Sequence, residues 1–227
     1  MGSGSQLGKT GTCHPLCIRG STPNSPVRGS ITRYTTKEEA DMAEVEAIKE
    51  VDSIKLISHL LEIRCSKQMS DIWNIGLNLA LRISDLLSIK FSDIQDDRLL
   101  IKESKTGKQA NIKLNSKVIK HIRRIQQEHP MHIYLFQSYR NQQAINAIPK
   151  PLSRRSVTKA FSLVGEELKL NLGTHSMRKT RGYHLYKQTK DIGRVMKMLR
   201  HGSEGVTLRY IGITQDNIDK DFVELEI

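Results

Sequence analysis

The sequence predicts an α+β fold that is mainly α-helical, with a small antiparallel β-sheet on one edge. Apolar residues recur at helical spacing through most of the chain after residue 35, and capping residues separate the runs. Two short stretches near residues 99–101 and 110–114 have strand character instead. At 227 residues the chain can bury one core, or one core plus an arm, so we expect a single domain.

Residues 1–35 are rich in Gly, Ser, Thr and Pro and show no apolar period. Such a segment cannot bury enough surface to offset the entropy of ordering, so we expect a flexible leader. Its first five residues are typical of leaders added for expression. We expect the main domain over 36–214 and a tail over 215–227.

The first helix is expected to open at Thr36-x-x-Glu39, a capping-box pattern, and to run towards Ile63. Its apolar positions include Val45 and Ile48. A second helix should cover about 71–81. Ser84 or Asp85 can then cap a short helix that ends near Ile89.

Residues 99–101 and 110–114 are expected to pair as a hairpin, because the polar turn 103–108 joins them. Further helices are expected near 115–128, 153–168, 175–187, 190–200 and 203–211. We expect Ser203 to cap the last of these. Residues 222–227 alternate apolar and acidic side chains, which predicts a final strand.

The charge balance indicates a polyanionic partner. The chain has 36 Lys and Arg against 24 Asp and Glu, a formal net charge of +12. Such a surface attracts nucleic acid, and double-stranded DNA is the expected partner. A basic protein without that role, or one that touches anionic lipid, is the alternative.

Other classes of site and compartment are disfavoured. No run approaches the ~20 apolar residues that cross a bilayer, and the first 30 residues lack an apolar signal core, so we expect a cytoplasmic, nucleoid-associated protein. Three cysteines do not form a disulfide framework. Cys13-His14-x-x-Cys17 has no second ligand pair, so we expect no zinc site and no metal.

Residues 175–210 concentrate the groups that phosphodiester chemistry needs. His175 and His201 can move protons, and the phenol of Tyr210 can attack phosphorus. Arginine suits a phosphate because its planar fork donates paired hydrogen bonds and stays charged, and we choose Arg82 and Arg178 for that role. Each choice is weak alone, and the order of the motifs is what supports it.

In that order the sequence resembles the tyrosine recombinase (phage integrase) family over about residues 40–215. The matching segments are Leu81-Arg-Ile-Ser-Asp-Leu-Leu87, Ser104-Lys-Thr-Gly107, Thr174-His-Ser-Met-Arg-Lys-Thr180, Leu199-Arg-His-Gly-Ser203 and Thr207-Leu-Arg-Tyr-Ile-Gly212.

The resemblance implies a role for each matched residue. Arg82 and Arg178 would hold the scissile phosphate, and His175 and His201 would bond to it and manage protons. Tyr210 would form a 3′-phosphotyrosyl bond to DNA. Reaction without ATP or a metal would follow, because the covalent link conserves the ester and the sequence has no Gly-rich nucleotide loop.

Competing residues remain for two of these roles. Lys105 would match the family's hairpin lysine, which gives a proton to the leaving 5′-oxygen, and Lys102 and Lys108 are close competitors. Tyr183 and Tyr186 are rival phenols, although both share a predicted helix with Arg178 and are expected to pack. Asp85 is expected to orient the region of Arg82.

The sequence also departs from the family pattern. Leu79-Ala80 stands where relatives often have Thr-Gly, and Arg200 stands where they often have Gly before the later histidine. We expect these changes to alter packing more than chemistry, although Arg200 could also touch DNA. No separate core-binding domain is apparent before the first helix, so the chain resembles an isolated catalytic domain.

Contacts with DNA outside the site are expected from basic residues that bind backbone phosphates without reading sequence. They are Arg154, Arg155, Lys159, Lys179 and Arg181. The alternative is a solvated basic face. In relatives the tail packs on a neighbouring subunit, so residues 222–227 could be exchanged between protomers of a DNA-bound homo-tetramer, or could pair within their own domain.

The resemblance thus implies a site-specific recombinase or integrase of prokaryotic or phage origin. Inversion, resolution or type IB topoisomerase activity would use the same chemistry. A DNA-binding protein that keeps the fold without catalysis is the alternative from another class.

Overall fold

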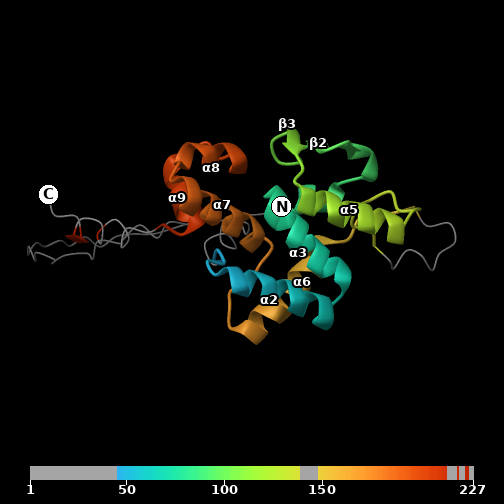
Figure 1. Cartoon of the computed structure of the whole chain (residues 1–227), viewed down its shortest axis with the longest axis horizontal. Helices are drawn as coiled ribbons and strands as arrows, with labels where there is room; N and C mark the ends of the chain where they lie inside the picture. The colour runs from blue at the N-terminus through green and yellow to red at the C-terminus, as the bar shows by residue number, and fades with distance from the viewer. Residues whose placement is uncertain (1–44, 139–147, 214–218, 220–222, 225–227) are drawn as a thin grey trace, which may run out of the picture. The chain divides into compact units, whose positions relative to one another are not determined.

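The computed structural model describes residues 45–138, 148–213, 219, 223 and 224. The predicted leader over 1–35, the capping box at 36–39 and the Cys13–Cys17 pattern lie outside these residues. Within them the chain is mainly helical, with one small sheet, as the sequence predicts (Figure 1). None of the described helices is both long enough and apolar enough to cross a membrane.

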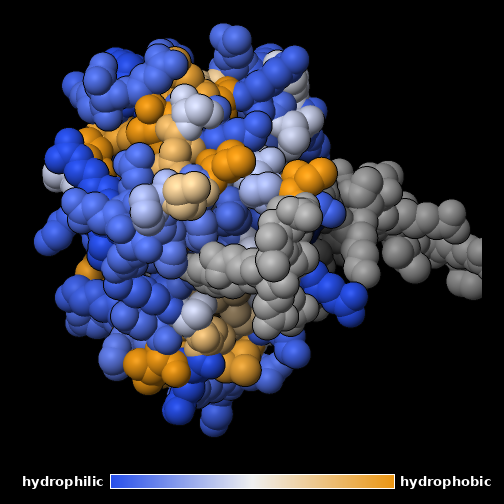
Figure 2. Space-filling model, turned by 90° about the vertical axis from the view of Figure 1, so that its right-hand side faces the viewer, coloured by the Kyte–Doolittle hydropathy of each residue, from blue (hydrophilic) through white to orange (hydrophobic). Residues whose placement is uncertain are grey.

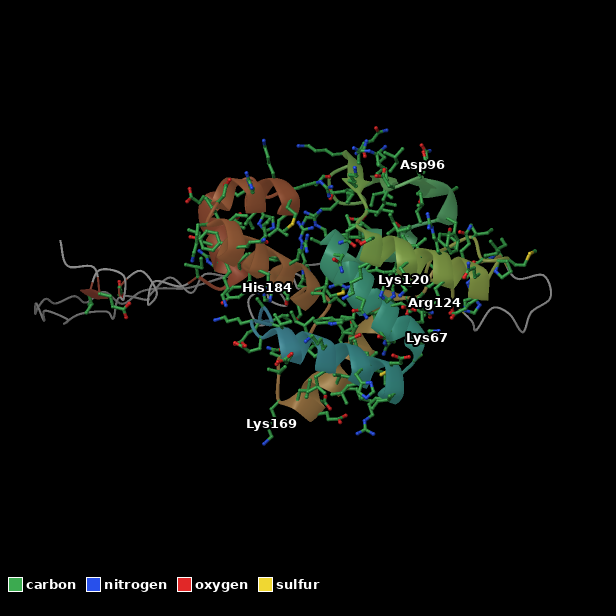
Figure 3. The ribbon with its side chains drawn as sticks, viewed as in Figure 1. Lys67, Asp96, Lys120, Arg124, Lys169 and His184 are labelled. Carbon is green, nitrogen blue, oxygen red and sulfur yellow. The ribbon has the colours of Figure 1, made fainter. Side chains whose placement is uncertain are left out.

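The predicted first helix begins later than expected. Helix α2 covers Val51–Arg64, and residues 45–50 have no regular structure. Their backbone groups bond to side chains of helix α7 (Ser176–Thr189), because Ile48 N donates to Thr180 Oγ1 at 2.8 Å and His184 Nε2 lies 3.1 Å from Ile48 O. Figure 3 labels His184 on this helix. The apolar spacing therefore marks burial of Ile48 against a distant helix and not a helical turn.

Helix α3 (Lys67–Leu79) passes through the middle of the domain and packs on α2 and α7 (Figure 1). It starts before the predicted residue 71 because the side chain of Ser66 accepts a hydrogen bond from Met69 N and caps it. Trp73 is fully buried and meets the ring of Phe161 edge to face at 5.6 Å. Helix α3 ends at Ala80, whose backbone is left-handed.

Helix α4 (Ile83–Ser88) lies where a short helix was predicted, but the expected caps are wrong. Arg82 occupies the N-cap position and makes no side-chain cap bond. Asp85 instead turns its carboxylate to the hairpin, where Oδ1 accepts from Ser104 N at 2.9 Å. The side chain of Ser84 lies 3.3 Å from Ser104 Oγ, so both candidate caps face the same residue.

The sheet contains the predicted hairpin. Strands β2 (Arg98–Lys102) and β3 (Gln109–Lys113) pair antiparallel, with Leu99 opposite Ile112. A two-residue strand, β1 (Ile94–Gln95), adds to β2 after the short 3₁₀ helix η1 (Phe91–Asp93), giving the order β1-β2-β3. Strand β1 is too short for the sequence to show a period of two.

The remaining helices lie close to their predicted positions. They are α5 (Ser116–Glu128), α6 (Arg154–Leu168), α8 (Ile192–Leu199) and α9 (Glu204–Ile211). Ser203 stands at the N-cap of α9 as predicted, but its side chain makes no cap bond. Instead, its carbonyl accepts from the backbone and hydroxyl of Thr207. Figure 2 shows one face of the molecule as largely hydrophilic, with apolar residues in small groups.

Helices α7, α8 and α9 form a small core of their own around Val195, Leu199 and Tyr210. Gly182 of α7 permits their close approach, because a Cβ there would lie 2.8 Å from Ile211 Cγ2 and 3.1 Å from Leu199 Cδ1. This packing brings α9 against the start of α7.

The strand predicted over 222–227 is not observed where the structure describes it. Val223 and Glu224 have helical backbone, and the rest of that segment lies outside the described residues. A strand needs a neighbour for its backbone groups, and the described sheet contains β1, β2 and β3 without this segment.

Candidate active site

A cavity of about 190 Å³ lies where the start of α4, the hairpin turn, the start of α7 and the α8–α9 region meet. The side chains that the sequence singled out for catalysis all line it. They are Arg82, Lys105, His175, Arg178, His201 and Tyr210. The structure therefore brings together residues that are up to 128 positions apart in the chain, from 82 to 210.

Arg178 forms the floor of this cavity. Its guanidinium is buried and donates to Ala80 O at 2.7 Å and to Leu199 O. Burial lowers the pKa of this guanidinium, although arginine still keeps its charge in proteins. The two carbonyls belong to the ends of α3 and α8, so Arg178 fixes both helices to the site.

Arg82 shares a buried carboxylate with a second arginine. Its NH1 lies 3.4 Å from Glu103 Oε2, and Arg200 NH1 donates to Glu103 Oε1. Burial alone would raise the pKa of Glu103, but the hydrogen bond from Thr106 and the charges of Arg200 and Arg82 outweigh it and hold the pKa below its ordinary value.

No sequence pattern singled out this carboxylate, because an acid in a polar turn is normally solvated. Arg200 was expected to alter packing more than chemistry, or to touch DNA, and the structure pairs it with Glu103.

Tyr210 is the buried nucleophile candidate. Its ring is 6% exposed, and its hydroxyl lies 3.4 Å from His175 Nδ1. Burial raises the pKa of the phenol to about 12, although the charges of Arg178 and Arg82 act to lower it. The phenol is therefore protonated at neutral pH, and attack on phosphorus requires a group that takes its proton.

A hydroxyl of α9 orients the ring of His201, which also meets the Tyr210 ring edge to face at 4.9 Å. Its Nδ1 lies 3.2 Å from Thr207 Oγ1, and that hydroxyl gives its own proton to Ser203 O. The hydroxyl must then accept from Nδ1–H, which leaves Nε2 as the nitrogen with a lone pair. Burial and the charges of Arg178 and Arg82 lower the pKa of His201 to about 4, so the ring is neutral at pH 7.

Lys105 is exposed on the hairpin turn, and of the three candidates Lys102, Lys105 and Lys108 it is the one that lines the cavity. The turn is closed by hydrogen bonds from Glu103 N to Lys108 O and from Gly107 N to Glu103 O, both of 2.9 Å. The left-handed backbone at Gly107 allows this closure.

The residues predicted to contact the DNA backbone differ in their exposure and in whether they line the cavity. Arg154 lines the cavity, Arg155 and Lys159 are exposed on α6, and Arg181 is half-buried on α7.

The prediction that Lys179 contacts the DNA backbone needs correction, because this residue is buried rather than exposed. Its Nζ donates to Val45 O at 2.5 Å and lies 5.3 Å from the centre of the Tyr210 ring, and burial lowers its pKa. Its ammonium group therefore lies over the ring of Tyr210.

The rival phenols Tyr183 and Tyr186 are partly buried against the small core of α7, α8 and α9, which is the packing role expected of them. Among the residues that the structure describes, no three His, Cys, Asp or Glu side chains gather as metal ligands would.

Comparison with known proteins finds one family model, described as the phage integrase family, that matches residues 49–216. Over 173 residues the chain is 35% identical to a probable integrase/recombinase, YoeC, of Bacillus subtilis (strain 168). That alignment covers 76% of this chain and 92% of YoeC.

Solved structures share the fold. XerA recombinase matches with a TM-score of 0.60 at 15% identity, covering 79% of this chain and 65% of that one. A lambda integrase dimer bound to a COC′ core site matches with a TM-score of 0.59 at 18% identity, covering 75% and 60%. This chain thus spans less than two thirds of either solved chain.

Proposed function

Because this chain belongs to the phage integrase family, we propose that it is a site-specific DNA recombinase that cuts and rejoins duplex DNA through Tyr210. The observation that carries the proposal is the cavity itself. One phenol, two arginines, two histidines and a lysine, each of a type that strand cleavage requires, line a space of about 190 Å³.

In this proposal the two arginines hold the scissile phosphate. Each terminal nitrogen of Arg178 carries two hydrogens, and a carbonyl takes one from each. Arg178 also has a hydrogen bond with the Tyr210 phenol, so its remaining N–H groups lie where a phosphate beside the phenol can accept from them. Arg82, half-buried beside the same cavity, adds positive charge where negative charge develops on phosphorus.

The proposed proton transfers use groups that line the cavity. The oxygen of Tyr210 attacks phosphorus and its proton goes to His175, whose Nδ1 is 3.4 Å away. The bond from phosphorus to the 5′-oxygen breaks, and Lys105 supplies the proton that this oxygen needs. The anionic phosphate would also raise the pKa of His201 by offsetting the neighbouring arginines, so that His201 can donate a hydrogen bond to it.

Rejoining is the reverse reaction. The tyrosyl–phosphate ester conserves the energy of the original bond, so a free 5′-hydroxyl can displace Tyr210 without ATP. We propose that no metal is needed either, because the arginines, histidines and Lys105 supply the charge and the protons.

A covalent adduct tests the proposal. The substrate is a pool of labelled duplexes that are random in sequence and nicked near the centre of one strand, so that cleavage releases a short fragment and traps the protein. We expect a DNA–protein adduct that withstands chelation of divalent metal and is lost in Tyr210→Phe. A fold that only binds DNA would shift the pool and form no adduct.

Assembly is a further part of the proposal. Exchange between two duplexes requires every strand to be cut once, so we propose a DNA-bound homo-tetramer with one protomer for each strand. Residues 36–214 would form its catalytic domain, and the tail over 215–227 would contact a neighbouring protomer. The lambda integrase that shares this fold was solved as a dimer on DNA.

A further inference from the structure

We propose that Glu103 is a positioning residue that ties the hairpin carrying Lys105 to Arg82 and Arg200. This inference rests on the proposed function, because it concerns where the general acid and the phosphate-binding arginine lie relative to Tyr210. Glu103 itself does not touch the DNA, since its side chain is 0% exposed.

The partners of Glu103 come from separate parts of the site. Arg82 precedes α4, Arg200 ends α8, and Thr106, whose Oγ1 donates at 2.7 Å, belongs to the hairpin turn. One carboxylate therefore joins elements that no backbone hydrogen bond connects in the described part of the chain. We call Glu103, Arg82 and Arg200 the carboxylate clamp.

Stability alone does not explain the clamp. Taking a carboxylate and an arginine out of water costs several kcal/mol each, and apolar residues of similar size often replace such a group without loss. A paired charge differs from apolar packing because its hydrogen bonds are directional. They fix where each partner lies. The expected consequence is geometric precision in the site.

Arg200 supports this interpretation. Its backbone is left-handed, with φ of 52°, at the C-cap of α8. Glycine is the usual residue there, and a residue with a Cβ costs about 1 kcal/mol more. The side chain that occupies this costly position is bonded to Glu103 and directly precedes His201.

The position of Lys105 depends on these contacts, because hydrogen bonds hold the residues on both sides of it in the chain. Ser104 donates from its backbone N and its Oγ to Asp85 Oδ1, at 2.9 and 2.5 Å. Thr106 donates to Glu103. The bond to Asp85 and the bond to Glu103 thus hold the chain on both sides of Lys105, whose side chain lines the cavity.

Three variants test the clamp: Glu103→Gln, Arg200→Gly and the double variant. Glutamine keeps the volume and an acceptor for Thr106 but loses the charge. At saturating DNA from the nicked pool we expect each single variant to form adduct about 10–100-fold more slowly, the loss expected from a misplaced catalytic group. DNA affinity should stay within about 3-fold. The double variant should be no slower than the slower single, because all three break the same connection.

The leaving group separates positioning from damage to the fold. A second pool carries sulfur in place of the bridging 5′-oxygen, and a thiolate leaves without a proton. If Glu103 positions Lys105, the Glu103→Gln defect should shrink on this pool. Equal slowing on both pools would overturn the proposal, as would a Glu103→Gln rate equal to that of the wild type. Asp97→Asn is the matched control, since it removes a carboxylate from the other end of the same sheet.

Hydrogen exchange gives a reading that does not depend on activity. The Gly107 amide donates to Glu103 O, so the turn 103–108 should exchange faster in Glu103→Gln than in the wild type. Absence of any wild-type adduct would refute the proposed function, and the exchange result would still decide the clamp. Unchanged exchange in a folded Glu103→Gln would refute the clamp.

Discussion

At the scale of single residues, burial keeps Tyr210 and His201 in their neutral forms. It raises the pKa of Tyr210 to about 12 and lowers that of His201 to about 4. Both groups therefore rest in a state that does not react at neutral pH. The negative charge of a bound phosphodiester is what would favour the charged form of His201. In the proposed mechanism, strand cleavage would therefore be disfavoured until DNA is bound.

His201 should make the fold sensitive to acid. Its pKa is about 4 in the fold and about 6.5 when unfolded, so the unfolded chain binds more protons between these values. The contribution of neutral His201 to stability is fully present above about pH 6.5 and is lost as pH falls towards 4. Allowing for a half-buried ring, we expect His201→Asn to remove about 1–2 kcal/mol of this pH dependence. Urea unfolding at pH 7 and 4.5 measures it, and an identical pH dependence in both proteins would contradict it.

Lys105 should act through the leaving group. Lys105→Ala is expected to slow adduct formation about 10²–10⁴-fold with an oxygen leaving group and far less with sulfur. Thermal stability should hardly change, because the side chain is exposed. Lys102→Ala and Lys108→Ala are matched controls on the same hairpin. If either of them, and not Lys105→Ala, shows the sulfur rescue, that lysine is the proton donor.

Sequence motifs pointed to candidate residues for the site, but they did not indicate Glu103 or the burial of Lys179. His175, His201 and Tyr210 stand in short ordered segments, and the structure places them in one cavity. Glu103 and the buried role of Lys179 depend on contacts made 97 and 134 positions away, with Arg200 and Val45. No local pattern carries that information.

At the scale of the elements, helical spacing predicted most of the helices because each one buries a single apolar face. It failed for residues 45–50, where the same spacing reflects contact with α7 and the backbone is satisfied by Thr180. Strand β1 was missed because two residues give no period. Local periodicity is thus a guide to burial, and tertiary partners decide the backbone shape.

The closeness of α7 to α9 should set the position of Tyr210. In Gly182→Ala the new methyl would lie 2.8 Å from Cγ2 of Ile211, the residue after Tyr210, so this part of α9 must shift. We expect a loss of about 1–3 kcal/mol and slower cleavage, with DNA affinity little changed. Melting and adduct rates measure these effects. Gly205→Ala, where no atom lies within 4 Å, is the control and should be neutral or stabilising. Similar losses in both variants would argue against the packing explanation.

At the scale of the whole molecule, a net charge of +12 draws DNA to the surface without saying where it lies. The exposed Arg155 and Lys159, on the helix whose first residue Arg154 lines the cavity, indicate one route for the backbone. Lys169 is the C-cap residue of the same helix, at the end away from Arg154 (Figure 3). Variants on this helix can therefore test whether DNA contacts α6 directly or responds only to the overall charge of the protein.

Arg155→Ala and Lys159→Ala should each weaken DNA binding in a salt-dependent way. If each cation replaces one counterion on a phosphate, each variant should reduce the slope of log affinity against log salt by about 0.9. Cleavage at saturating DNA should stay unchanged, since neither residue lines the cavity. Anisotropy titrations over a range of salt measure the slope. Lys169→Gln should leave it unchanged, because a charge that acts only through the overall field releases no bound ion. An equal change in all three slopes would mean that DNA does not follow this helix.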